Sequence, residues 1–483
     1  MFRISKFLNH YKNLSKPAKA SLWFIACYII QRGLQFIGMP IYTRIMNTEE
    51  YGIYSVFLSW FTLICVFTSL NIYSGTFNKA MVKYEKERDS YISSIQWLTF
   101  VISIIVCGFM TLFHNIVAEK TGFSLKLQLL MCIHVILFPS LQYWSQKQRF
   151  LFEYKKLVAV TLINSVASLL LGVIFVSISS EKSFALIAVT VVVQAVINSI
   201  IFFSLSEKGK TFYHNDYWKW SLCTAIPLLP HYISEIILGH ADRLMINQMC
   251  GVSEAGIYNI VYQISMVMTI IRAGINGSFA PWLYYSLKEK KYQDIKKISE
   301  LLTYLLAGMT ILFMLIGPEI LKIAAPSPYY DAAICIPSIM QGCFYIYVYV
   351  LFMYVEIYYE KTHGVAIASI TAAIANLLLN YIFIPRFGYK AAAFTTMISY
   401  MLMAVLHYYF LMKIIKAEPE IVNVYNFKMI FFTSLFILIF GILILEIYEF
   451  PVIRYCLICL ILLFAIHKRK RIADMISILK RRD

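Results

Sequence analysis

The chain has 483 residues, of which 60% are hydrophobic and only 14% are charged, and its mean hydropathy is +0.69. Apolar side chains in this proportion outnumber what the core of a soluble domain can bury, which excludes a soluble globular protein. The formal net charge of +17 comes from lysines and arginines in loops and tails, so it requires no nucleic-acid partner.

Apolar runs of about twenty residues, the length that a helix needs to cross hydrocarbon, recur along the whole chain. The alternating segments of an outer-membrane barrel are absent, so we predict an all-α membrane protein. About fourteen transmembrane helices are expected, near residues 18–41, 51–75, 91–113, 126–144, 157–179, 183–205, 218–240, 256–280, 298–317, 332–357, 364–384, 389–412, 427–447 and 451–466. The connections are too short for a soluble domain, so the function must be carried out within the helix bundle or at its two ends.

The lysines and arginines indicate how the chain is oriented in the membrane. With the N-terminus in the cytoplasm, most of the 43 basic residues fall on inner loops and tails, as the positive-inside rule requires. Both termini are therefore expected in the cytoplasm. Residues 1–12 and 467–479 mix basic and apolar side chains, which fits either a topology signal alone or amphipathic helices on the anionic inner leaflet.

An internal repeat predicts the domain organisation. The segment Thr48-Glu-Glu-Tyr-Gly-Ile-Tyr54 at the second span returns as Val252-Ser-Glu-Ala-Gly-Ile-Tyr258 at the eighth. Six spans separate the copies, and because six is even, both halves begin on the same side of the membrane. We expect two six-helix lobes, 1–205 and 206–412, related by an axis along the membrane normal, and then a segment 413–483 with the last two spans. Such duplicated transporters bind their substrate between the halves, near the midplane.

Two arginines lie deep within predicted spans. Arg32 and Arg272 are near the centres of the first and eighth spans, where a charge costs about 3 kcal/mol even on lenient insertion scales. The alternatives are a structural pair with a carboxylate or a polar cavity for an anion. Guanidinium donates two parallel hydrogen bonds to phosphate or carboxylate, so we interpret both arginines as contacts to an anionic substrate. The amides Asn71 and Asn276 are candidate contacts to sugar hydroxyl groups.

Titratable residues of the seventh span are candidates for coupling to an ion gradient. His231 and Glu235 are four residues apart, hence on one helical face, just after two prolines that would break the helix and free carbonyls for a cation. With Asp242 they form a candidate proton or sodium site. The alternative is a hydrogen-bonded pair near the outer mouth, with Asp242 and Arg243 neutralising each other. Glu356 in the tenth span is interpreted as interfacial.

The sequence lacks the signals of catalysis and of metal or nucleotide binding. Cys456 and Cys459 have the spacing of a zinc or redox pair, but they lie inside the last apolar span without a second pair or a nearby histidine. No Gly-rich phosphate loop of the Walker type is present, so direct use of ATP is not expected. We therefore predict no catalytic residue, no metal and no cofactor.

Four segments, in order along most of the chain, carry a resemblance to a known family. They are Ile41-Tyr-Thr-Arg-Ile-Met46 through Tyr54, Ala241-Asp-Arg-Leu-Met-Ile246 through Tyr258, Gly317-Pro-Glu-Ile-Leu-Lys322 with Tyr330-Asp-Ala332, and Asn380-Tyr-Ile-Phe-Ile-Pro-Arg-Phe-Gly-Tyr-Lys-Ala-Ala-Ala393. Together they resemble Wzx-type polysaccharide repeat-unit flippases, in the polysaccharide-transporter branch of the multidrug/oligosaccharidyl-lipid/polysaccharide exporter (MOP) superfamily.

The resemblance implies transport without covalent chemistry. Oligosaccharide repeat units linked to undecaprenyl diphosphate would cross the bacterial cytoplasmic (inner) membrane by alternating access, for O-antigen or capsule synthesis. Related lipid II flippases use arginines of the first and eighth spans on the headgroup diphosphate, and Arg32 and Arg272 lie in those spans. Membrane lipids, a proton or sodium ion and a polysaccharide polymerase complex are the implied partners.

Two other functions are weighed against this one. A multidrug or cation antiporter of the same superfamily would favour an acidic cavity, whereas the deepest charges here are arginines. A membrane glycan polymerase or ligase, an enzyme, would need a sizeable outer loop with catalytic residues, which the sequence does not contain. The charge pattern therefore favours a flippase.

Overall fold

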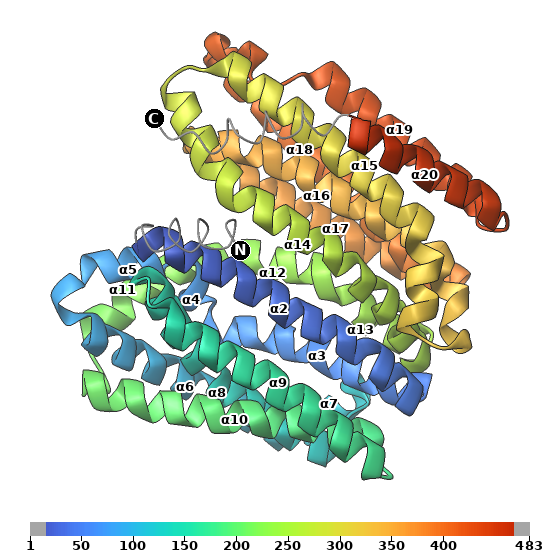
Figure 1. The fold of residues 1–483 in the computed structure, drawn as a ribbon. Coiled ribbons are helices and arrows are strands. Elements are labelled where there is room, and N and C mark those ends of the chain that lie inside the picture. Colours follow the sequence, from blue (N-terminus) through green and yellow to red (C-terminus); the bar gives the residue numbers. More distant parts are fainter. Residues whose placement is uncertain (1–15, 468–483) are drawn as a thin grey trace, which may run out of the picture. The chain divides into compact units, whose positions relative to one another are not determined.

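The computed structural model describes residues 16–467, and all regular secondary structure in this range is helical (Figure 1). Twelve helical segments of the described chain are long and apolar enough to cross a membrane. The predicted eighth and fourteenth spans fall on α14 (Val252–Lys288), which is not among the twelve, and on the shorter apolar helix α20 (Pro451–His467). The all-α membrane class is thus confirmed. The predicted amphipathic ends, 1–12 and 468–479, lie outside the described residues.

Packing divides the chain into two compact units, Met1–Ile236 and Ile237–Asp483. The first contains α2 (Lys16–Ile45), α3 (Thr48–Ser69), α4 (Ile72–Gly75), α5 (Phe77–Lys83), the 3-10 turn η1 (Glu85–Glu87), α6 (Arg88–Leu112), α7 (His114–Thr121), α8 (Leu125–Phe150), α9 (Tyr154–Ile178), α10 (Lys182–Gly209), α11 (Asn215–Ala225), the 3-10 turn η2 (Ile226–Leu228) and α12 (Leu229–Ile236). Helix α10 packs against α8, α9 and α6, and α2 packs against α9. A cluster of buried aromatic residues, including Tyr91, Tyr143 and Tyr217, joins α6, α8 and α11.

The second unit begins with a π-helical turn, η3 (Ile237–Ala241), and α13 (Asp242–Met249). It continues with α14, α15 (Tyr292–Ala324), the 3-10 helix η4 (Ser327–Ile334), α16 (Cys335–Tyr358), α17 (Thr362–Phe387), α18 (Lys390–Ala417), the 3-10 turn η5 (Pro419–Asn423), α19 (Phe427–Ile447) and α20. Helix α16 is the central helix of this unit, because α14, α15, α18 and α19 all pack against it.

The two C-terminal helices are held to the second unit by polar contacts. Gln341 Nε2 of α16 donates to the carbonyl oxygen of Ile437 on α19 at 2.8 Å. Arg454 of α20 is 2% exposed, and its Nη1 donates to Glu319 Oε2 of α15 at 2.7 Å. A buried charge is stable in such a place only when it is paired, so this ion pair attaches α20 to α15. Figure 1 shows α19 and α20 in red beside α15.

The repeated segment marks the start of one helix in each unit. In α3, Asn47 and Glu50 form a capping box, in which each side chain accepts a hydrogen bond from the other residue's backbone N–H at 2.8 Å. The repeated glutamate of the second copy, Glu254, has the same position, third in α14. Gly251, the residue just before α14, has a φ of 126°, a backbone conformation that favours glycine. The repeat thus preserves a glutamate at a helix N-terminus, where it satisfies or complements free N–H groups.

The seventh span is not one continuous helix. It runs through α11, η2, α12, η3 and α13, with Pro227 in η2 and Pro230 in the first turn of α12. Proline has no N–H to donate and its ring clashes with the preceding turn, which explains the break that the sequence predicts here. The division between the compact units falls at Ile236–Ile237, within this span, whereas the sequence placed the whole span in the second lobe.

Close packing at Gly209 generates a prediction about the first unit. A Cβ at this position would overlap the carbonyl group of Asp89 and the Cβ of Ser93, so Gly209→Ala must displace backbone between α10 and α6. We expect the free energy of unfolding to fall by about 1–3 kcal/mol. The thermal unfolding midpoint, followed by tryptophan fluorescence of the purified protein, measures this change.

Gly108→Ala is the matched control, because nothing lies within 4 Å of a Cβ at Gly108 in α6. Its midpoint should equal or exceed that of the unmodified protein, since alanine is the better helix former. Equal midpoints for the two variants would show that α10 and α6 are not in close contact at Gly209.

Candidate functional site

The first deep arginine, Arg32, lies on α2 and is half-buried. Its Nη1 donates to Gln35 Oε1 at 3.0 Å, and its guanidinium group lies 5.4 Å from the centroid of the Tyr28 ring. Among the described residues no carboxylate forms an ion pair with Arg32. The local contacts are therefore to neutral groups, which leave the positive charge uncompensated.

The second deep arginine, Arg272, lies near the middle of α14 in the second unit. Its Nη1 is buried and has no hydrogen-bond partner, and no carboxylate of the described chain pairs with it. The charge lies within electrostatic range of Cys343, Tyr354 and Tyr400, which are not acidic residues. A buried guanidinium nitrogen without an acceptor is costly, so this donor is available for an anionic ligand.

The candidate amide Asn71 lies at a break in the second span. Leu70 and Asn71 have φ values of 49° and 48°, in the left-handed region, and separate α3 from α4. For residues other than glycine this conformation costs about 1–2 kcal/mol. The equivalent positions of the repeat, Gly274 and Ile275, lie within the unbroken helix α14. The break is thus a feature of the first unit alone, and a broken helix inside a membrane is typical of a binding site.

Asn276, the other candidate amide, is half-buried on α14. It follows Arg272 by four residues, so the two side chains lie on the same face of the helix. This face combines a free guanidinium donor with an amide that can both donate and accept hydrogen bonds.

The candidate coupling residues of α12 are only loosely associated. His231 Nε2 lies 3.9 Å from Glu235 Oε1, and the Glu235 side chain is 52% exposed. His231 Nδ1 is buried without a hydrogen-bond partner. The spacing of four residues brings His231 and Glu235 together, as the sequence predicts. The Glu235 carboxylate nevertheless remains accessible at the protein surface.

Asp242, in contrast, is the centre of a buried polar cluster in the second unit. It is 1% exposed and accepts three hydrogen bonds, from Tyr258 Oη at 2.8 Å and from Asn380 Nδ2 and Thr396 Oγ1 at 2.7 Å each. Asn376 Nδ2 donates to Thr396 Oγ1 at 3.0 Å. The cluster therefore joins α13, α14, α17 and α18 around one carboxylate.

The neighbouring Arg243 is 3% exposed and does not form an ion pair with Asp242 in the described structure. Its Nε donates to Asn259 Oδ1 at 3.0 Å, its Nη1 donates to the carbonyl oxygen of Gly239 at 2.6 Å, and its guanidinium group lies 4.0 Å from the centroid of the Tyr262 ring. Asp242 and Arg243 therefore do not neutralise each other through a direct ion pair in the described structure.

The partners of Asp242 come from helices far along the chain and could not be assigned from sequence. A signal was present: Asn376 and Asn380 are four residues apart in an apolar span and so share a helix face, and Thr395 and Thr396 follow on the next helix. Such polar residues on one face of a membrane helix indicate a buried network.

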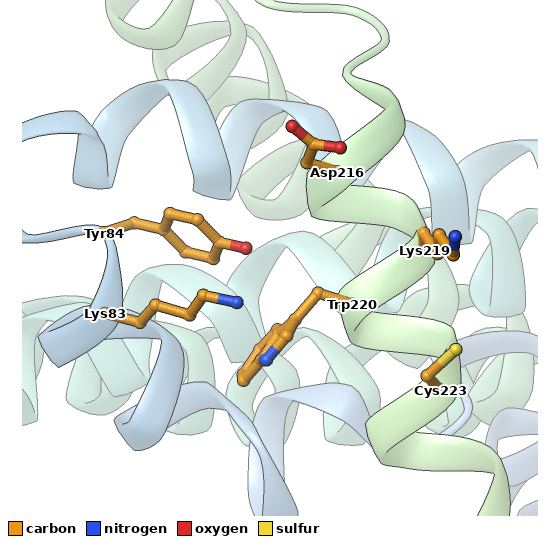
Figure 2. Close-up of a pocket in the computed structure, with 6 residues that line it drawn as sticks. All are labelled: Lys83, Tyr84, Asp216, Lys219, Trp220 and Cys223. Atoms are coloured by element: carbon orange, nitrogen blue, oxygen red, sulfur yellow. The ribbon is translucent and has the colours of Figure 1, made fainter.

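An open cavity of about 480 Å³ lies in the first unit (Figure 2). The residues that line it come from α5, the residue after it and α11, and are Lys83, Tyr84, Asp216, Lys219, Trp220 and Cys223. Lys83 Nζ is directed between two aromatic rings, 5.1 Å from the centroid of Tyr84 and 4.9 Å from that of Trp220 (Figure 2). None of these residues was selected from the sequence, because lysine and aromatic residues at a membrane boundary are typical of ordinary interfacial anchoring.

Glu356, interpreted from the sequence as interfacial, lies two residues before the end of α16. It is fully buried within the second unit and paired with His407 of α18. The histidine is 51 residues away, so the pairing depends on how α16 and α18 pack. In the described part of the chain, no group of three or more His, Cys, Asp and Glu residues could hold a metal ion.

Comparisons with known proteins agree with this architecture. The lipid II flippase MurJ, in an inward closed conformation, has the same fold with a TM-score of 0.68 over 93% of this chain and 99% of that chain, at 12% identity. An inward-facing multidrug resistance transporter of the MATE family, in the MOP superfamily, gives a TM-score of 0.62 over 81% of this chain and 96% of that chain, at 11% identity. The chain therefore shares the fold of these two proteins.

Sequence relatives place the chain more narrowly. It is 22% identical over 317 residues to a protein of the Lsg locus of Haemophilus influenzae, covering 63% of this chain and 75% of that protein. It is 20% identical over 444 residues to an uncharacterised membrane protein of Methanocaldococcus jannaschii, covering 83% and 85%. The profile of the polysaccharide biosynthesis protein family matches residues 18–286. The chain belongs to this family, as the resemblance to polysaccharide transporters predicts.

The Asp242 cluster generates a second prediction. Thr396→Val keeps the shape of the side chain but removes one donor to Asp242 and the acceptor for Asn376, so two buried polar atoms lose a partner. We expect the free energy of unfolding to fall by about 1–3 kcal/mol. The thermal unfolding midpoint of the purified protein measures this effect.

Thr310→Val is the matched control, because Thr310 is equally buried in the second unit but only donates to the carbonyl oxygen of Leu306 in its own helix. That carbonyl group keeps its helical partner after the substitution. A Thr396→Val midpoint as high as that of the control would mean that the hydrogen bond to Asp242 adds nothing to stability.

Proposed function

We propose that this protein flips oligosaccharide repeat units linked to undecaprenyl diphosphate across the bacterial cytoplasmic membrane, by alternating access and with both chain termini in the cytoplasm. The observation that carries the proposal is Arg272, a guanidinium group inside a membrane helix with a buried nitrogen that no group of the described chain accepts from. Membership of the polysaccharide biosynthesis protein family supports a role in making a surface polysaccharide.

The arginines are proposed to bind the anionic part of the substrate. A diphosphate offers several oxygens to a planar guanidinium fork, and the resulting charge-assisted hydrogen bonds are stronger than those to neutral groups. Arg272 and Arg32 can each supply one such fork, and both lack a carboxylate partner in the described structure. Asn276, on the face of Arg272, and Asn71, at the break in the second span, are proposed to bind hydroxyl groups of the sugar.

The chemistry proposed for this protein is transport without bond making or breaking. The MOP fold supports this, because it is shared with a flippase and with multidrug transporters. Membrane lipids would surround the helices, and a polysaccharide polymerase complex would receive the flipped unit. An antiporter of organic cations would need a negative substrate site, whereas the unpartnered guanidinium nitrogen of Arg272 favours an anion. The flippase is therefore the better-supported function.

Asp242 is proposed to couple transport to a cation, either a proton or a sodium ion. A carboxylate, two amide oxygens and hydroxyl groups are the oxygen donors that a hard cation prefers. Binding a cation here would neutralise a carboxylate that is buried without a paired positive charge. The more exposed His231–Glu235 pair is the alternative site for the same role.

The substrate assignment predicts the effect of removing one guanidinium group. Arg272→Ala should lower the flux of a labelled undecaprenyl-diphosphate oligosaccharide into proteoliposomes at least about tenfold, the value of one charge-assisted hydrogen bond. Arg272→Lys should retain part of the flux, because it keeps the charge but loses the fork. The flux is normalised to the amount of reconstituted protein.

Arg386→Ala serves as the control for this series, since Arg386 is exposed in the last turn of α17. It should transport like the unmodified protein. Undiminished flux in Arg272→Ala would remove Arg272 from the substrate site and, with it, the main support for the proposed function.

The coupling assignment predicts different behaviour for two acidic residues of the seventh span. Asp242→Asn should abolish the stimulation of flux by an imposed proton or sodium gradient, because a neutral amide cannot hold a cation by charge. Glu235→Gln, the control, should keep the full stimulation. Testing the two gradients separately identifies the coupling ion. The reverse result, with stimulation lost in Glu235→Gln alone, would assign coupling to the His231–Glu235 pair.

A further inference from the structure

A second buried titratable site lies in the second unit, apart from the Asp242 cluster. Glu356 Oε1 of α16 lies 2.7 Å from His407 Nδ1 of α18, and both side chains are 0% exposed. The other polar atom of each group, Glu356 Oε2 and His407 Nε2, is buried without a hydrogen-bond partner. Buried polar atoms are nearly always paired, so two such atoms in one ion pair require an explanation.

The surroundings close this pair off from its environment. The ring of Tyr349 stacks on the His407 ring, with centroids 5.4 Å apart and planes inclined by 17°. On the other side, a Cβ at Gly364 would lie 3.0 Å from Glu356 Oε2 and 2.9 Å from the Phe410 ring. The backbone of α17 therefore packs directly against the unpaired carboxylate oxygen, and glycine is what permits this approach.

Glu356 and His407 form no ion pair with any third residue in the described structure. Ionisable residues on the elements that pack around it form no hydrogen bond or ion pair with the Glu356 or His407 side chains in the described structure. They are Tyr349 and Glu360 from α16 and the residues after it, Lys361 and His363 at the start of α17, Lys413 on α18, Glu418 and Glu420 at η5, and Tyr284 on α14. The net charge of the pair is thus decided by its own protons.

The number of bound protons decides what burial costs. An ionised Glu356 beside a neutral His407 has a net charge of −1, and one added proton makes the pair neutral whichever residue holds it. Removing that proton would leave a net charge buried in the closed site, which is expensive. The proton can leave only after a rearrangement that brings water to the site. Protonation and conformation are therefore linked, which is the property that a coupling group needs.

We propose that Glu356 and His407 form a proton-binding site that is distinct from the cation site at Asp242, and that its protonation drives transport. The role of this protonation in driving transport rests on the proposed function. The two sites differ in chemistry: Asp242 is surrounded by oxygen-bearing partners that saturate it, whereas the Glu356–His407 pair keeps one acceptor and one ring nitrogen free for proton exchange.

The first experiment detects the proton itself and does not depend on any substrate. Infrared difference spectra of the purified full-length protein in lipid are recorded as a function of pH. We expect a pH-dependent band of the proton-bound pair that is lost or shifted in Glu356→Gln. It is a carboxylic-acid C=O band if Glu356 holds the proton and an imidazolium ring band if His407 holds it. The glutamine can still accept a hydrogen bond from His407 Nδ1, so the contact between α16 and α18 is preserved.

Glu360→Gln is the matched control, because Glu360 is exposed just beyond α16. It should leave the band unchanged, while His407→Gln, a second variant in case Glu356→Gln does not fold, should shift the pH at which the band changes. Identical pH-dependent spectra for the unmodified protein and Glu356→Gln, or an unshifted band in His407→Gln, would overturn the proton site and leave a structural pair.

The second experiment tests the link to transport. The stimulation of flux by an imposed proton gradient should fall to a ratio of about one in Glu356→Gln, with gradient-free flux retained, and should be unchanged in Glu360→Gln. Full stimulation in Glu356→Gln would overturn the coupling role. Absence of flux from the unmodified protein as well as from every variant, with the infrared band still assigned to the Glu356–His407 pair, would contradict the proposed function and leave the proton site intact. The two failures are therefore distinguishable.

Discussion

The cost of an unpaired polar group inside hydrocarbon governs the architecture of this protein. Water is absent from the membrane core, so buried donors and acceptors must find partners within the bundle. Serine and threonine hydroxyls meet this requirement locally, as when Thr310 donates to the carbonyl oxygen of Leu306 in its own helix. Charged groups need partners from other helices, and Arg454 finds Glu319 across the contact of α20 with α15. The same requirement joins four helices around Asp242.

Against this background, four of the buried polar atoms without a partner belong to charged or titratable groups proposed here to act in transport. Arg272 Nη1, Glu356 Oε2, His407 Nε2 and His231 Nδ1 are all buried without a hydrogen bond. Each leaves a cost that a purely structural role would have removed, for example by an apolar side chain of similar volume. An anion at Arg272 and a proton at the Glu356–His407 pair would each remove that cost. Of these groups, Arg272 is proposed to bind the substrate and the Glu356–His407 pair to bind the driving proton.

The internal duplication has been modified in ways that suit these roles. Both copies retain a glutamate as the third residue of a helix, Glu50 in α3 and Glu254 in α14. After that common start the copies differ, because α3 ends at the left-handed residues Leu70 and Asn71, whereas α14 continues for 37 residues. The two deep arginines also come from helices that are not equivalent in the repeat. A duplicated scaffold has therefore acquired different polar residues in its two units, which suits an asymmetric ligand.

The sequence by itself determined the class of protein, the approximate position of most membrane helices and the internal repeat. It could do so because the thickness of hydrocarbon requires about twenty consecutive apolar residues, and because helix breaks at Pro227 and Pro230 follow from the missing N–H of proline. It also singled out Asp242 and Arg272, since a charge inside an apolar run is visible without knowledge of its neighbours.

Only the tertiary structure decided which buried groups meet. Asp242 takes its partners from 138 and 154 residues away in Asn380 and Thr396, and Glu356 takes His407 from 51 residues away. These pairings depend on the rotation of each helix about its axis and on the register between neighbouring helices, which are set by side-chain packing. Hydropathy reports how deep a residue lies but not the direction it faces, so the sequence did not show that Glu356 is buried against His407.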